Sequence, residues 1–194
     1  ENFFFSPELL ISFEDLETNS TASTQLRKQE GTYQDLNFNY SLNYDLRNSK
    51  FQPSSGNVTT FLQELPVVSD NQEISNTLTH TKYRMLNQST NMVGKASIYL
   101  KAVNSLDSSD VRISKRAFVP YNRLRGFQKG KIGPVDNKDY IGGNYISTIN
   151  LSTNLPTILN TVENLDFNYF IDIANVGGVD YNDTIDESYK FRSS

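Results

Sequence analysis

The feature that most constrains this chain is a two-residue alternation of apolar and polar side chains, because that period is typical of strands and not of helices. In one run, Phe38 and Leu42 alternate with Asn39 and Asn43. Successive strand residues point to opposite faces, so such a run predicts a strand with one apolar face. Five runs show the pattern clearly, at 3–13, 37–47, 92–102, 145–155 and 165–173.

Two further segments, 57–66 and 73–86, are predicted as strands, but the phase of their alternation is less clear. In the second of them both sets of alternating residues contain polar side chains. We expect its outer face to carry Thr77, Thr79, Thr81, Tyr83 and Met85.

The lengths of the clear runs favour a transmembrane barrel over a soluble sandwich. Four of the runs cover eleven residues and the last covers nine, whereas a typical globular strand has about 5–6 and a transmembrane strand about 9–11. The apolar face of each clear run carries no charge, as a lipid-facing surface requires, because a Lys or Arg there costs about 2–4 kcal/mol at the bilayer midplane. A soluble β-sandwich adhesin also alternates, so alternation by itself leaves both folds open.

The connections between the predicted strands alternate in length. Long loops are expected near 15–35 and 103–143, and short turns at 48–56, 87–91 and 156–162, with a medium loop at 67–72. Outer-membrane barrels have short periplasmic turns and long extracellular loops. The predicted fold is therefore all-β: an antiparallel transmembrane β-barrel fragment of about seven strands, forming an open curved sheet because an odd number does not close such a barrel.

Composition excludes several kinds of chemistry. The 194 residues include no cysteine and one histidine, His80, which removes disulfides, thiol catalysis and Cys-ligated metals. A net charge of −4 argues against nucleic-acid binding, which needs a basic surface. No metal site, cofactor or catalytic residue is predicted, and the chain is not expected to be an enzyme.

Three local motifs carry more specific information. The second long loop contains Arg125-Gly126-Phe127 and ends in Gly142-Gly143-Asn144. A turn has the spacing Asp-x-Arg-x5-Pro-x2-Gly, and an aspartate lies on the inward parity of the last strand. These positions are Asp45, Arg47, Pro53 and Gly56 in the turn and Asp172 in the strand.

In this order and spacing the chain resembles the BamA family of outer-membrane protein assembly factors. The resemblance implies that residues 1–194 are a partial outer-membrane barrel domain, about strands seven to thirteen of sixteen, located in the cell outer membrane. It implies a part in an insertase that folds and inserts β-barrel proteins without nucleotide or covalent chemistry. The implied partners are unfolded outer-membrane proteins, outer-membrane lipids and, through periplasmic domains missing here, assembly lipoproteins.

The resemblance also implies roles for the motif residues. Arg125 is expected to pair with Asp172 on the barrel wall, through two hydrogen bonds from one guanidinium to one carboxylate. Gly126 would allow a tight turn, and Phe127 would bury its ring against the wall. An inward glutamate that many family members carry on the strand after the loop is replaced by Ser152, so Arg125 would depend mainly on Asp172.

Other functions stay open at this stage. A TamA-like protein or a two-partner secretion transporter would share the barrel and the Arg-Gly-Phe loop. A passive porin would not need that loop, and its constriction would be lined with charges.

Overall fold

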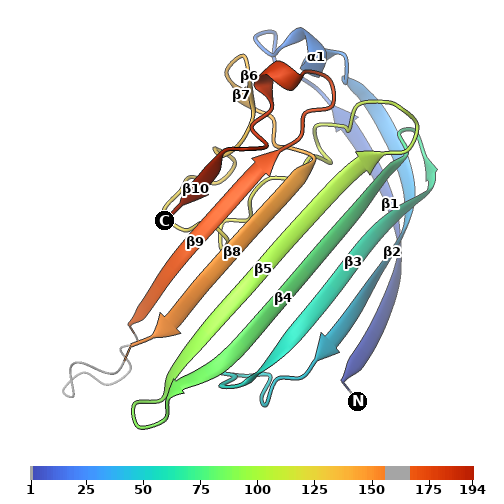
Figure 1. Cartoon of the computed structure of the whole chain (residues 1–194). Helices are drawn as coiled ribbons and strands as arrows, with labels where there is room; N and C mark the ends of the chain where they lie inside the picture. Colours follow the sequence, from blue (N-terminus) through green and yellow to red (C-terminus); the bar gives the residue numbers. More distant parts are fainter. Residues whose placement is uncertain (1, 156–166) are drawn as a thin grey trace.

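The computed structural model describes residues 2–155 and 167–194, and within them the protein is almost entirely β-structure (Figure 1). Eight strands form one antiparallel sheet in the order β1-β2-β3-β4-β5-β8-β9-β10. Seven of the strands are long or of moderate length: β1 (Phe3–Leu16), β2 (Gly31–Asp45), β3 (Gly56–Ser69), β4 (Glu73–Asn87), β5 (Met92–Ser105), β8 (Tyr145–Asn154) and β9 (Asn168–Gly177). The remaining elements are short: α1 (Thr24–Arg27), β6 (Val135–Asp136), β7 (Asp139–Tyr140), the 3-10 helix η1 (Asp183–Ile185) and β10 (Phe191–Ser193).

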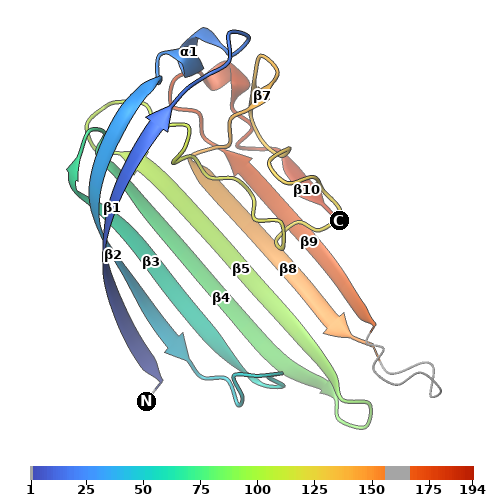
Figure 2. The same cartoon turned by 180° about the vertical axis from the view of Figure 1, so that it is seen from behind.

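The sheet is curved and open, as the alternation predicts. β1 and β10 are its two edges in the described residues, and the chain ends lie at opposite edges (Figures 1 and 2). The strand count is eight instead of about seven, because Phe191–Ser193 folds back and pairs with Ile173–Asn175 of β9. Only three residues long, β10 offers too short an alternation to be recognised in the sequence.

Pairing across the sheet assigns each strand residue to a face, because directly opposite residues of antiparallel strands point to the same side. One row runs from Thr81 through Ser97 and Asn150 to Asp172. The concave side that carries this row is called the lumen face below, and the convex side the outer face. Within the clear runs, the polar residues Asn43, Lys101, Asn150 and Asp172 share the lumen face, and the apolar residues Leu42, Ile98 and Leu151 share the outer face, as the alternation predicts.

The predicted face of β4 is wrong. Thr81 lies in the lumen row, so Thr77, Thr79, Tyr83 and Met85 also face the lumen, and His80, Lys82 and Arg84 point outward. Thr81 is buried there, with its hydroxyl 2.9 Å from that of Ser97. Both faces of β4 are polar, so local alternation carried no contrast from which to choose between them.

Connections differ at the two ends of the sheet. The short turns 46–55 and 88–91 lie at one end, and the loops 17–30, 106–144 and 178–190 lie at the other (Figure 1). The medium loop expected at 67–72 is wrong, because β3 and β4 extend to leave only residues 70–72 between them. The turn predicted at 156–162 and the start of the strand predicted from 165 lie outside the described residues.

The buried apolar residues lie between the loops and the lumen face, not between two sheets. Ala117, Val119 and Leu124 of the loop 106–144 pack on Ile146 of β8 and on Ala174 and Val176 of β9. A second cluster joins Leu26 of α1, Ile141 and Val179. Figure 2 shows the loop 106–144 lying across β8 and β9 on this side of the sheet.

Among the described residues, no helix is long and apolar enough to cross a membrane.

Candidate functional site: a loop fastened to the lumen wall

The site begins at Asp172, which β9 places on the lumen face. Its side chain is completely buried (0% exposed). Asn150, directly opposite on β8, donates a hydrogen bond from Nδ2 to Asp172 Oδ1 at 2.9 Å. The two strands therefore fix the orientation of the Asp172 carboxylate by a hydrogen bond that does not involve the loop.

Arg125 binds that carboxylate through three donors. Its Nε lies 2.7 Å from Asp172 Oδ2 and its Nη2 lies 2.7 Å from Oδ1, while its backbone N–H donates to Oδ2 at 3.0 Å. The predicted two-bond contact is thus present, and the backbone bond adds a third. The Asp172 carboxylate raises the pKa of Arg125 above its ordinary value through these hydrogen bonds. This bidentate geometry holds the guanidinium plane in one orientation.

One face of the Arg125 guanidinium is covered by Phe170 of β9. The guanidinium carbon lies 3.6 Å from the centre of the Phe170 ring, a cation–π contact. Gly126 follows with a φ of +82°, in the region that glycine adopts without strain, so the predicted tight turn is present.

The expectation for Phe127 is wrong. Its side chain remains 38% exposed, and the pocket that it lines is formed by residues of the same loop, among them Val119, Leu124 and Ile132. Phe127 therefore packs among residues of its own loop and is not buried against the wall.

A second arginine of the loop tip, Arg123, also enters the lumen row. Its Nη1 donates to the Ser97 hydroxyl at 2.8 Å, and its backbone carbonyl accepts from Asn150 Nδ2 at 2.7 Å. Its guanidinium carbon lies 5.2 Å from the centre of the Tyr99 ring. Asn150 therefore contacts both Asp172 and the loop backbone, which ties the two arginines into one network. Arg123 and Arg125 line one pocket together with Ser152, whose hydroxyl forms no hydrogen bond with either arginine.

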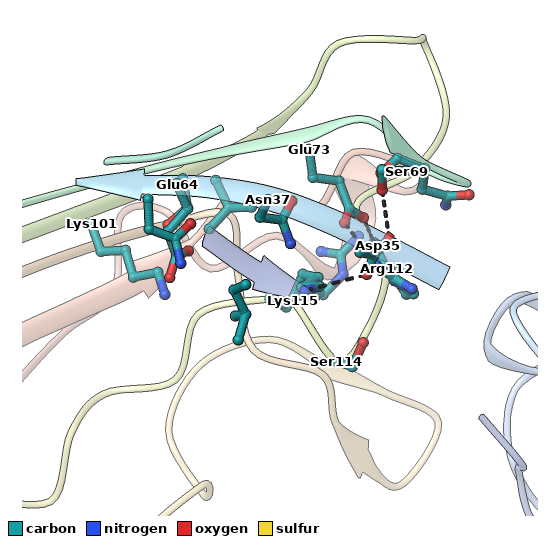
Figure 3. A pocket seen from close by; sticks show the side chains of 15 residues that line it. Asp35, Asn37, Glu64, Ser69, Glu73, Lys101, Arg112, Ser114 and Lys115 are labelled. Carbon is teal, nitrogen blue, oxygen red and sulfur yellow. Dashed lines mark hydrogen bonds and ion pairs between the residues drawn. The ribbon is translucent and has the colours of Figure 1, made fainter. Parts of the chain in front are cut away.

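The base of the loop is fastened by a third arginine (Figure 3). Arg112 is 1% exposed, and its Nη2 lies 2.7 Å from Asp35 and 3.5 Å from Glu73, with Nη1 3.3 Å from Glu14. These carboxylates come from β2, β4 and β1. The cluster borders a polar cavity of about 240 Å³ on the lumen face.

Arg116 links the loop 106–144 to the following loop. It forms an ion pair with Asp180 and donates to Asn144 Oδ1 at 3.2 Å. Asp180 also accepts from the Val111 backbone N–H at 2.7 Å. The Gly-Gly-Asn segment at the end of this loop thereby lies against an earlier part of the same loop, where Gly143 and Ala117 exchange two backbone hydrogen bonds of 2.8 and 3.0 Å.

The predicted turn motif lies at the opposite end of the sheet. Arg47 donates from Nε and Nη2 to the two oxygens of Asp45, at 2.9 and 2.7 Å, which raises the pKa of Arg47. Gly56 has a φ of +93°, and a Cβ there would lie 2.1 Å from the Leu46 carbonyl oxygen, so no other residue fits. Pro53 lies in the irregular part of the turn, next to Gln52 with its φ of +47°.

The family profile described as the Omp85 superfamily domain matches residues 4–194, nearly the whole chain. The chain belongs to the Omp85 superfamily. No curated protein matches it significantly in sequence.

Among solved structures, this Omp85 chain is similar to the crystal structure of BamA from Haemophilus ducreyi lacking POTRA domains 1–3. The TM-score is 0.73 at 20% sequence identity, over 84% of this chain and 35% of that chain. The likeness shows a shared fold, and the Omp85 chain spans about a third of the length of the protein it matches.

Sequence reasoning missed Arg112, Arg116, Arg123 and Phe170 at this site. The first three belong to the same loop as Arg125, so a concentration of arginine within one loop was the available signal. Phe170 lies two residues before Asp172 on the same face of β9, but its importance depends on its contact with Arg125, a residue distant in sequence.

Proposed function

We propose that this chain is part of an Omp85 barrel of the cell outer membrane that folds and inserts other β-barrel proteins. The observation that supports this best is the contact of Arg125 with Asp172, which joins the tip of an Arg-Gly-Phe loop to the barrel wall through three hydrogen bonds. Together with the superfamily match, this is the arrangement that the resemblance to assembly factors implies.

In this proposal the contact of Arg125 with Asp172, called the clasp below, keeps the loop 106–144 on the lumen face. A loop of this length loses much conformational entropy when it is ordered, so it needs several anchors. Arg112, Arg116 and Arg125 provide ionic anchors near its base, its middle and its tip. The motif residues Arg125, Gly126, Phe127 and Asp172, and the turn residues Asp45, Arg47, Pro53 and Gly56, act structurally; no covalent step is assigned to any of them.

The substrates in this proposal are unfolded outer-membrane proteins, bound by strand addition to an exposed sheet edge. We place the chain at about strands seven to thirteen of a sixteen-stranded barrel, so that edge lies outside it. Assembly lipoproteins would bind periplasmic domains that are likewise outside residues 1–194.

The test uses the full-length protein in proteoliposomes and an unfolded outer-membrane protein diluted from urea. Folding is followed by the change in electrophoretic mobility between unheated and heated samples. We expect the wild type to speed folding over empty liposomes, and Arg125→Ala and Asp172→Ala each to slow it several-fold. Arg27→Ala, at an exposed arginine of α1, is the matched control. Equal rates with and without the protein would refute the insertase function.

A transporter of the TamA-like or two-partner secretion type is the second candidate, because the superfamily match is shared by such barrels. It predicts a different outcome in the same liposomes: no faster folding of the added protein, but passage of an unfolded polypeptide into the vesicle, where added protease cannot reach it.

A further inference from the structure

The outer face of β4 carries two cations, Lys82 and Arg84, in a region that otherwise has none. The outward positions of β2, β3, β5, β8 and β9 contain no Lys, Arg, Asp or Glu. Both cations are exposed, and among the described residues neither forms an ion pair with a carboxylate.

The two cations stand at the short-turn end of the sheet. β3 begins at Gly56 opposite Tyr83, so Arg84 projects beyond the end of its neighbour, and Lys82 is level with Asn57. On the other side, Arg84 pairs with Gly94, which pairs with Thr153, one residue before β8 ends. In a barrel this position is near the periplasmic boundary of the bilayer, where a Lys or Arg costs only about 0–1 kcal/mol.

A groove begins directly beside them. Lys82 and Arg84 lie opposite Ala96 and Gly94. The Leu86 side chain covers Gly94, since a Cβ there would lie 3.0–3.3 Å from Leu86 Cγ, Cδ1 and Cδ2, so the low part of the β5 surface is at Ala96. Leu86 stands on one side, and Leu151 and Ile171 on the other, around a space of about 450 Å³. This volume is within the roughly 300–1,000 Å³ of sites for small ligands. The floor rises again at Ile98, two residues from Ala96 or about 7 Å along the strand.

Tyr169 completes the rim. It lies in the same row as Gly94 and Thr153, is 61% exposed, and lines the groove. Tyrosine is enriched where a membrane surface meets water, because its ring is apolar and its hydroxyl is polar. Two cations, an amphipathic ring and an apolar channel therefore follow one another from the rim toward the middle of the sheet.

We propose that this groove, formed by Lys82, Arg84, Leu86, Gly94, Ala96, Leu151, Tyr169 and Ile171, binds an anionic glycerophospholipid of the periplasmic leaflet. Arg84 and Lys82 bind the phosphate of the headgroup, since a guanidinium matches phosphate oxygens in pairs and an ammonium acts as a point charge. One acyl chain lies over Ala96 between Leu86 and Leu151. Charge selects this occupant: two cations with no acidic neighbour in the described outer face attract an anionic headgroup over a zwitterionic one. The proposal requires the sheet to lie in a bilayer but does not depend on insertase activity.

The test places a fluorescent label in the groove of the full-length protein. Thr153→Cys, in a background without other cysteines, is labelled with bimane and reconstituted in phosphatidylcholine nanodiscs. A fixed fraction of brominated phosphatidylglycerol or of brominated phosphatidylcholine is then added, because bromine quenches bimane on contact. In the wild type we expect stronger quenching by phosphatidylglycerol than by phosphatidylcholine. The association of phosphatidylglycerol relative to phosphatidylcholine should fall about five-fold for each cation removed, first in Lys82→Gln and then in Lys82→Gln/Arg84→Gln.

Two controls separate the site from general effects. Lys50→Gln removes one charge from a turn at the same end of the sheet and should leave the selectivity unchanged. Ala96→Leu fills the groove on an exposed surface and should reduce quenching by both lipids, with the protein still showing the folded electrophoretic mobility.

Equal quenching by the two lipids in the wild type would overturn the proposal, as would full selectivity in the double variant. Displacement by lipopolysaccharide and not by unlabelled phosphatidylglycerol would also overturn it, because the occupant would then be a different lipid. Since no substrate protein is present in these nanodiscs, a negative result leaves the proposed insertase function standing, and a failed insertase assay leaves the lipid site standing.

Discussion

Two arginines of the same loop are fastened to the barrel wall in different ways. At the tip, Arg125 keeps 37% of its side chain exposed and meets one fully buried carboxylate. At the base, Arg112 is 1% exposed and lies among the carboxylates of Glu14, Asp35 and Glu73. The tip pairs one cation with one anion, whereas the base surrounds one buried cation with an excess of negative charge.

The two arginines also differ in how completely their donor groups are hydrogen-bonded. Asp172 accepts two hydrogen bonds from the Arg125 side chain, one from the Arg125 backbone and one from Asn150. The directions of these hydrogen bonds fix the geometry of the contact. Arg112 has Nε and Nη1 buried without a hydrogen-bond partner among the described residues. We infer that the tip provides orientation and that the base provides binding free energy through charge.

The largest effect is expected from Arg112→Met. Removing the buried cation leaves Glu73 without an ion pair among the described residues and Asp35 with only the partly exposed Lys115, which costs about 3–5 kcal/mol. Thermal unfolding of the full-length protein in detergent, read by electrophoretic mobility, measures it. Lys115→Met is the matched control: Lys115 lies 3.5 Å from Asp35 but is 34% exposed, so its loss should cost less than about 1 kcal/mol. Equal costs for the two variants would show that burial is not what distinguishes Arg112.

Next in size are the changes at the tip. Arg125→Ala and Asp172→Ala should each destabilise the docked loop by about 1–3 kcal/mol, between the values for exposed and buried pairs. Arg125→Ala should be the worse, because it leaves a buried carboxylate, while Arg125 without Asp172 can turn toward water. Limited proteolysis of the loop in intact vesicles reports the opening. The double variant should be little worse than either single one; strictly additive effects would disprove the coupling.

A smaller effect is expected from Arg125→Lys. The charge remains, but the paired hydrogen bonds and the stacking on Phe170 are lost, so the cost should be about 1 kcal/mol. A spin label on the loop should show a broader range of distances to the wall, with the mean position unchanged. A full shift of the loop out of the lumen would mean that orientation, and not charge, holds the tip.

The smallest effect is expected from Phe127→Ala. The ring is 38% exposed and contacts residues of its own loop, so we expect no more than about 1 kcal/mol, below the roughly 1.5–3 kcal/mol of a fully buried side chain. The rate of loop proteolysis should stay within a few-fold of wild type. A loss of loop stability as large as that of Arg125→Ala would indicate that Phe127 packs against the wall, as first expected.

Much of the clasp could be predicted from the sequence because its parts are local. Arg125 and Gly126 belong to a recognisable loop motif, and the parity of Asp172 within β9 assigns its face once one apolar neighbour such as Ile171 points outward. The cluster at the base could not be predicted in this way. Glu14, Asp35 and Glu73 are distant in sequence and meet at Arg112 only when the four strands β1 to β4 pair in register.

By itself, then, the sequence determined the strands, the open curved sheet and the faces of those strands that contrast apolar with polar residues, such as β2 and β5. Alternation is a local property that each strand expresses independently of its neighbours. Only the tertiary structure decided the face of β4, the addition of β10, the packing of Phe127 and the groove beside Lys82 and Arg84. The face of β4 and the groove depend on register, which is set by pairing between distant segments and moves every side chain to the opposite face when it slips by one residue. β10 depends on pairing with β9, and the packing of Phe127 depends on how its loop folds on itself.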